Sequence, residues 1–336
     1  MKKLLLVLSL AFILFVFGAN GAFAAGLCCQ LSSGVQENIM GVAGPGTHNL
    51  SVFLDYNFNM MDKLREGTHE KSVQDIENEG KYTSIPEKME MTRYSLTLAY
   101  GFTPRFKMLV NVPYVHNTMD MQMKKGMMWM PHTMEPVSGL GDITVMGLYR
   151  LLTDRDIRPT AALTAGVGVK TPTGSYTEKN SKGNFIHAHM QPGTGSWDPI
   201  LTLIYSKLMN PWLFQADVTY EIATRNNEGY EFGNTFTANV LAKYGLVPIM
   251  NLTGELTYLH TGRASDRDGK YTNLMSLEDD PANTGEDSLW FSPGFELVPL
   301  KNGSLNVKAQ LPLWQRVNGV QLVTSYRIIT GVNYSF

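Results

Sequence analysis

A dense group of methionines has the most distinctive chemistry in this sequence. Seven of the 19 methionines in the chain fall within the sixteen residues from Met119 to Met134. Thioether sulfur is a soft ligand that suits Cu(I) or Ag(I), and a histidine could add a nitrogen. Alternatively, these flexible side chains pack a loop inward as a hydrophobic lid, which is the interpretation we favour. The candidate metal ligands are Met119, Met121, Met123, Met127, Met128, Met130, His132 and Met134.

Nucleophilic catalysis is a second chemistry to consider. It needs a serine activated by a nearby histidine, with a third group that orients the histidine. The seven histidines are scattered along the chain, and no His-x-Ser pair stands at the end of a candidate strand. We therefore predict that the protein is not an enzyme and needs no cofactor.

The elements that must position these residues are β-strands, because twelve stretches of the chain alternate apolar and polar residues. A strand presents successive side chains to opposite faces, so each stretch has one apolar and one polar face. Each stretch also reaches the ~9–11 residues that a tilted strand needs to cross the hydrocarbon of a membrane. The predicted strands are residues 49–60, 92–102, 106–116, 141–152, 157–170, 197–208, 211–223, 232–244, 249–260, 287–299, 303–314 and 321–336.

The connections between these strands are alternately short and long, with one short exception among the long ones, at 315–320. Short turns on the periplasmic side and long loops outside are typical of bacterial outer-membrane barrels. The sequence therefore predicts an all-β protein, a transmembrane antiparallel β-barrel of about twelve strands over residues 49–336. The predicted long extracellular loops are residues 61–91, 117–140, 171–196, 224–231 and 261–286.

The polar face of these strands should line the lumen of the barrel. It carries charges of both signs, which would be untenable against hydrocarbon. Two interpretations stay open, a structural lining of ion pairs and a selective path for solutes. The predicted lumen-lining residues are Asp55, Arg93, Arg150, Lys170, Asp217, Glu221, Glu255, Glu296, Lys308 and Arg327, with Lys107, Lys243 and Gln310 on the same face.

The two ends of the chain indicate how the protein reaches its membrane. Lys2 and Lys3 precede an apolar run and a small-x-small site that ends at Ala24, which predicts a signal peptide over residues 1–24. Residues 25–48 lack alternation and form either a periplasmic segment or a plug. The chain ends on Phe336, which resembles the terminal aromatic signal that barrel assembly machinery recognises. We therefore expect a bacterial outer-membrane location, with lipids and that machinery as partners.

The net charge and a family resemblance limit the possible functions. A formal net charge of −2 argues against nucleic-acid binding, which needs a basic surface. Residues 139–143 (GLGDI), 170–174 (KTPTG), 193–198 (GTGSWD), 292–294 (SPG) and 311–319 (LPLWQRVNG) together resemble the outer-membrane transporter family linked to a meta-pathway of phenol degradation. The resemblance implies a channel that passes small molecules, including hydrophobic or aromatic ones, but it transfers no substrate-binding residues. A barrel that handles Cu(I) or Ag(I) through its methionine-rich loop is the alternative.

Overall fold

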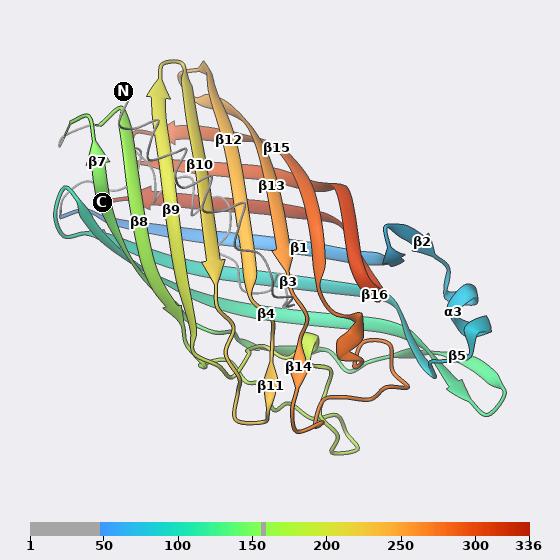
Figure 1. Cartoon of the computed structure of the whole chain (residues 1–336). Helices are drawn as coiled ribbons and strands as arrows, with labels where there is room; N and C mark the ends of the chain where they lie inside the picture. The colour runs from blue at the N-terminus through green and yellow to red at the C-terminus, as the bar shows by residue number, and fades with distance from the viewer. Residues whose placement is uncertain (1–47, 156–158) are drawn as a thin grey trace, which may run out of the picture.

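Antiparallel strands, each hydrogen-bonded to its neighbour along the chain, close into a barrel in the computed structural model of the protein (Figure 1). The structure describes residues 48–155 and 159–336. The predicted signal peptide, 1–24, and nearly all of the predicted segment 25–48 lie outside these ranges. Eleven labelled strands of the described chain form the ring: β1 (Leu50–Gly67), β3 (Ser84–Gly101), β4 (Phe106–Lys125), β7 (Thr144–Thr153), β8 (Ala161–Lys170), β9 (Asp198–Met209), β10 (Trp212–Glu221), β12 (Thr235–Val247), β13 (Met250–Thr261), β15 (Glu286–Leu300) and β16 (Gly303–Ser335).

The last of these, β16, contributes two crossings of the barrel. Its residues from Gly303 to Val317 pair with β15, and those from Val317 to Ser335 pair with β1. The chain reverses at the predicted Asn-Gly turn, where Gly319 has a positive φ of 57°. Because β16 pairs with β1, the ring is closed, and the predicted antiparallel barrel with twelve crossings is confirmed.

The period of two in the sequence decides which side chains face the inside of the barrel. On β1, Ser51, Phe53 and Asp55 are buried, whereas Leu54 between them is 58% exposed. Gly331 of β16 lies opposite Asp55, and a Cβ at Gly331 would be 2.5 Å from Asp55 Oδ1. Glycine therefore makes room for an inward-facing carboxylate. Along the strands, apolar side chains point outward, while the packed inward face holds many polar ones.

The two ends of the barrel differ, as predicted. Short turns join the strands at one end, and long segments join most of them at the other, at the lower right of Figure 1. Among the described residues, no helix is long and apolar enough to cross a membrane. The long segments contain small elements of their own: β2 (His69–Lys71), α3 (Val73–Glu79), β5 (Met128–Thr133), β6 (Val137–Leu140), η2 (Ala188–Met190), β11 (Tyr230–Glu231), β14 (Ser265–Asp266) and η3 (Pro281–Asn283).

An apolar cluster attaches the segment between β1 and β3 to the rim of the barrel. Ser72 starts α3 with a capping box, in which its side chain accepts a hydrogen bond from Asp75 N. Ile76 of this helix is fully buried against Leu64, Tyr82 and other apolar residues of the same cluster. The helix is short, and this packing rather than its intrinsic stability holds it in place.

The strands near the long-loop end extend further than the sequence predicted. The predicted loop 61–91 is in part strand, because β1 continues to Gly67 and β3 begins at Ser84. The predicted loop 117–140 is mostly β-structure, since β4 continues to Lys125, turns at Gly126 and pairs with β5. The reason is that alternation continues here: Asn117, Met119 and Met121 are all buried.

Candidate functional site: the barrel interior and the loop packed against it

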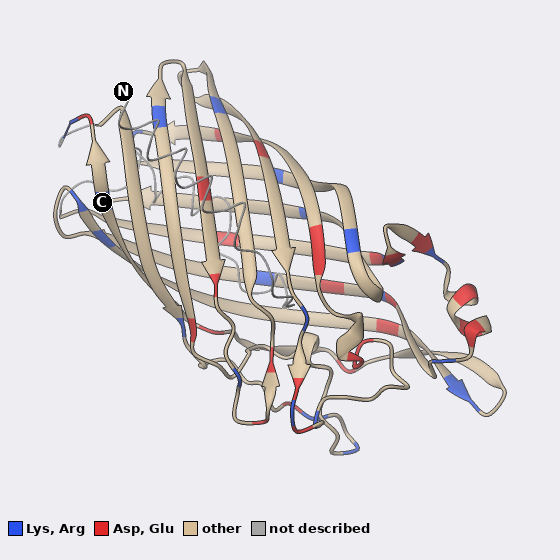
Figure 2. Cartoon of the chain, viewed as in Figure 1, with Lys and Arg blue, Asp and Glu red and all other residues tan. Residues whose placement is uncertain are grey.

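The inward-facing charges of the barrel form buried ion pairs. Lys308 Nζ lies 3.0 Å from Glu255 Oε2, and Lys243 Nζ lies 2.8 Å from Glu296 Oε2. Each pair spans a strand that lies between its two members, because β13 and β16 flank β15, and β12 and β15 flank β13. The Lys308 and Glu255 side chains are only 1% and 6% exposed. Figure 2 shows charged positions of both signs along the strands as well as in the loops.

A third group of charges lies where β8, β9 and β10 meet the long-loop end. Lys170 Nζ is 2.8 Å from Asp198 Oδ2 and 2.5 Å from Glu221 Oε1. The Lys170 side chain is 3% exposed and the Asp198 side chain is fully buried. One cation thus ties three adjacent strands together at the point where the chain leaves the barrel wall.

Other predicted lumen residues bond to neutral partners. Arg93 donates to Ser95 Oγ at 3.1 Å and to Asn111 Oδ1 at 3.0 Å. Asp217 accepts a hydrogen bond of 2.8 Å from Asn239 Nδ2. The contacts with Asn111 and Asn239 link neighbouring strands on the inside of the wall.

The remaining two arginines lie at different heights of the barrel. Arg150 donates to the carbonyl oxygen of Pro104 at 3.0 Å, in a short turn. Arg327 donates to Gln310 Oε1 at 2.9 Å and lies 4.8 Å from the ring centroid of Trp290. The predicted interior charges therefore have polar or aromatic partners, an arrangement that a structural lining requires. Their effect on solute selectivity stays a prediction.

A single carboxylate joins three of the glycine-rich motifs. Asp142 Oδ1 accepts a hydrogen bond of 2.9 Å from Gly174 N, and Oδ2 accepts bonds of 2.7 Å from both N and Oγ1 of Thr194. Ser196 Oγ continues the network to Asp198 Oδ2 at 3.0 Å. Because Asp198 pairs with Lys170, the network attaches the loop between β8 and β9 to the inside of the barrel wall.

The glycines of these motifs allow this close approach. A Cβ at Gly193 would lie 2.5 Å from Asp142 Oδ1, and one at Gly174 would lie 2.8 Å from Gly193 Cα. Gly195 has a φ of +73°, and a Cβ there would meet the ring of Tyr176 at 2.5 Å. The role of Asp142 was not predicted from the sequence. The available signal was an acidic residue directly after a Gly-x-Gly sequence.

The methionine-rich segment divides into a buried part and an exposed part. Met119 and Met121 are buried in a cluster with Met89 and Met190, and Met123 and Met134 pack against that cluster. At the hairpin tip, by contrast, Met127 is 93% exposed, and Met128, Met130 and His132 are exposed as well. The structure thus does not bring the eight candidate ligands together in one place. Within the described ranges, no three His, Cys, Asp or Glu residues could hold a metal ion.

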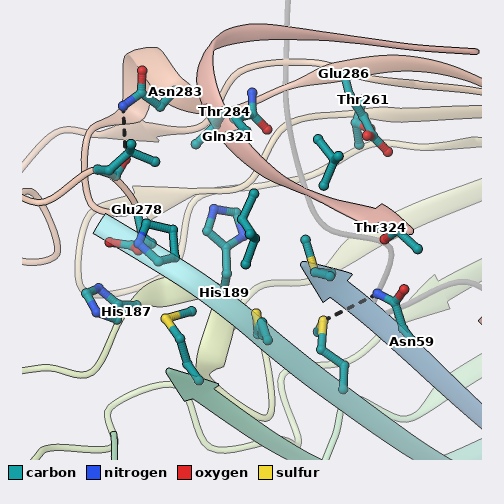
Figure 3. Close-up of a pocket in the computed structure, with 18 of the residues that line it drawn as sticks. Asn59, His187, His189, Thr261, Glu278, Asn283, Thr284, Glu286, Gln321 and Thr324 are labelled. Atoms are coloured by element: carbon teal, nitrogen blue, oxygen red, sulfur yellow. Dashed lines mark hydrogen bonds between the residues drawn. The ribbon is translucent and has the colours of Figure 1, made fainter. Parts of the chain in front are cut away.

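A cavity of about 130 Å³ lies beside this methionine cluster. Its wall combines residues of β1, β3, β4, β13, β15 and β16 with residues from two long loops. Figure 3 shows His187, His189 and Glu278 of these loops near one another, with Asn59 and Thr324 of the barrel wall facing them. The cavity is therefore formed only when the loops pack against the inside of the barrel.

The histidines at this cavity differ in charge. Burial lowers the pKa of His187, but its hydrogen bond to Asp279 and the charges of Asp279 and Glu278 outweigh burial and raise that pKa to about 9. Burial lowers the pKa of His189 to about 4, and burial also raises the pKa of Glu278 to about 7. At neutral pH, a charged His187 thus ties the two loops together, while a neutral His189 faces the cavity.

A family model described as "Putative MetA-pathway of phenol degradation" matches residues 90–311 of the chain. The fold is similar to that of an outer-membrane channel from Pseudomonas putida F1, with a TM-score of 0.58 and 15% identity; 95% of this chain and 100% of that chain are covered.

Two further solved structures are similar at a lower level. They are a FadL homologue from Pseudomonas aeruginosa (TM-score 0.42, 9% identity, 94% of this chain and 99% of that chain covered) and the toluene transporter of Ralstonia pickettii (TM-score 0.43, 9% identity, 95% and 96% covered). No curated protein matches the sequence.

Proposed function

Because the chain belongs to the MetA-pathway phenol-degradation family, we propose that it is an outer-membrane channel for small molecules, including hydrophobic or aromatic ones. The observation that carries this proposal is a closed barrel with apolar side chains outside and a polar, ion-paired interior. The similar Pseudomonas putida F1 protein is an outer-membrane channel, which supports the same location for this chain. Membrane lipids would surround the barrel, and the solute would pass through its interior. The proposal assigns no catalytic residue.

The loop between β8 and β9 would control access to this channel. It packs against inward-facing residues of the wall, with Asp142 as the acceptor of three hydrogen bonds that hold it there. The His187–Asp279 contact ties it to the loop between β13 and β15. Passage of a solute would therefore require local release of these contacts.

Conductance of the refolded protein in planar bilayers tests this function. We expect discrete current steps that small aromatic solutes reduce. Asp142→Ala should increase the open current or the frequency of opening, since the released loop would no longer narrow the mouth. Asp154→Ala is a matched control, because Asp154 also accepts hydrogen bonds from backbone N–H groups, those of Thr160 and Ala161, but in a short turn at the other end. A folded protein with no current, and no uptake of aromatic solute into lipopolysaccharide-coated vesicles, would contradict the proposal.

Phe336 is proposed to act as the assembly signal. Its side chain is 66% exposed, and its backbone N–H donates to Leu50 O at 2.9 Å, so the terminus lies at the seam between the first and last strands. Deletion of Phe336 should reduce the amount of barrel in the outer membrane and leave protein in the periplasm, whereas Phe102→Ser, at another exposed aromatic near the short turns, should have less effect. Cell fractionation with heat-modifiable gel migration measures both. Normal membrane levels after the deletion would refute the assignment.

Metal handling is a weaker candidate. The burial of Met119 and Met121 among other methionines is what a hydrophobic lid requires, and it leaves Met127 and Met128 separate at the hairpin tip. Binding of Cu(I) or Ag(I) by the methionine-rich segment stays a prediction.

A further inference from the structure

The cavity beside the methionine cluster has the size of a single aromatic ring. Its volume of about 130 Å³ is close to the ~150 Å³ of an engineered apolar cavity that binds benzene. Met61, Met89, Met91 and Met119 contribute to its wall, together with aliphatic side chains such as Leu322. Methionine adapts its shape to irregular contents, and thioether sulfur contacts aromatic rings favourably. The apolar part of this wall therefore suits a flat ring.

Three polar atoms of residues that line the cavity are buried and have no hydrogen-bond partner among the described residues. They are Asn59 Oδ1, Thr261 Oγ1 and Glu278 Oε1. The amide nitrogen of Asn59 already donates to Met91 Sδ at 3.8 Å, and the other carboxylate oxygen of Glu278 accepts from Ser276 Oγ at 3.0 Å. A buried polar atom without a hydrogen-bond partner is unfavourable, so we expect a ligand or a water molecule to form a hydrogen bond with each of these atoms.

The chemistry of these three atoms indicates what the ligand must supply. An amide oxygen and an ionised carboxylate accept hydrogen bonds only, whereas a threonine hydroxyl can donate as well as accept, and so can the carboxyl of Glu278 when it is protonated, since its pKa is about 7. A group with an O–H or N–H donor would satisfy any of them. A bare hydrocarbon would satisfy none, and it would leave the atoms buried and unpaired.

We propose that this cavity binds a single-ring aromatic molecule that bears a hydroxyl or amino group. The ring packs against the methionine side chains, and the donor group reaches one of Asn59, Thr261 and Glu278. The inference rests on the proposed channel function in that the bound molecule would be a solute held at the long-loop end before passage. A soft metal ion fits less well, because aliphatic side chains such as Leu277, Leu322 and Val323 share the wall and the cavity is roomy for an ion.

Titration of the detergent-solubilised full-length protein with phenol, anisole and toluene tests the proposal. Loss of one hydrogen bond to a buried acceptor should weaken binding on the order of tenfold, so phenol should bind more tightly than anisole or toluene by about that factor. With 13C-methyl-labelled methionine, the signals of Met89, Met91 and Met119 should shift on binding. The signal of Met127, at the exposed hairpin tip, is the internal control and should not move.

A triple variant, Asn59→Leu with Thr261→Val and Glu278→Leu, removes all three unpaired polar atoms of the site. We expect its affinity for phenol to fall toward that of toluene, while its affinity for toluene is retained because the apolar wall is intact. Equal binding of phenol, anisole and toluene by the wild-type protein would overturn the donor requirement, and that comparison does not depend on folding of the variant. Shifts of the cavity methionines with Ag(I) but not with phenol would replace the proposal by a metal site.

Measuring permeation as well as binding shows whether the proposed binding site or the proposed channel function is wrong. If phenol leaves the cavity methionines unshifted while the refolded protein still conducts, the binding site is wrong and the channel function stands. If phenol shifts them but the folded protein passes no ion or solute, the binding site stands and the channel function is wrong.

Discussion

Replacement of Lys308 by methionine is expected to destabilise the barrel by about 3–5 kcal/mol, because it leaves the Glu255 carboxylate buried without its cation. Lys308 Nζ and Glu255 Oε2 are 3.0 Å apart, and both side chains are almost completely buried. The charge of Glu255 cannot return to bulk water while the barrel stays folded. Chemical unfolding of the protein in detergent micelles, followed by the tryptophan fluorescence or the β-type circular dichroism, measures the loss.

Two controls distinguish a buried-pair effect from a general effect of removing a lysine. Lys270 pairs with Glu228 in the loops, with side chains 43% and 24% exposed, so Lys270→Met should cost at most ~1 kcal/mol. The double variant Lys308→Met with Glu255→Leu should recover much of the lost stability, because an apolar pair replaces a desolvated ion pair. A Lys308→Met variant as stable as Lys270→Met would show that the interior is more hydrated than the burial of this pair implies.

Leu98→Arg on β3 is expected to reduce barrel stability by roughly 2–4 kcal/mol, the cost of an arginine on the lipid face near the membrane midplane. The Leu98 side chain is 40% exposed on the outer surface, and it lies opposite Val52 of β1 and Val110 of β4. An arginine there must either enter hydrocarbon or bend toward the headgroups. Unfolding in phospholipid vesicles measures the cost.

The matched control for this substitution is Met127→Arg. Met127 is 93% exposed at the tip of the β4–β5 hairpin, beyond the barrel, where an arginine stays in water. Its cost should be close to zero. Equal costs for Leu98→Arg and Met127→Arg would mean that the outer face at Leu98 does not contact lipid.

The barrel and the direction in which its side chains face could both be predicted from the sequence. A strand repeats every two residues, so Leu54 and Leu98 could be placed outside and Asp55 inside without knowledge of any partner strand. Tight turns are likewise local, and the Asn318-Gly319 reversal was predictable from its two residues. The residues with inward-facing charges were predicted on the same basis.

The tertiary structure alone decided what those charges contact. Lys308 reaches Glu255, and Lys243 reaches Glu296, across an intervening strand, and such pairs depend on strand register and barrel curvature rather than on local sequence. From the alternation alone, Glu255 was one of several interior charges whose role could be permeation or packing. Its pairing with Lys308 is a property of the closed barrel.

The contacts of the loops were even less predictable from the sequence than the ion pairs of the barrel. Asp142 holds Gly174 and Thr194, which lie 32 and 52 residues further along the chain, and the cavity combines residues from six strands and two loops. No periodicity relates positions so far apart, because the contacts form only when the loops fold back against a barrel that is already closed. The sequence could therefore identify the methionines, histidines and glycine-rich motifs, but long-range packing decided which of them share a site.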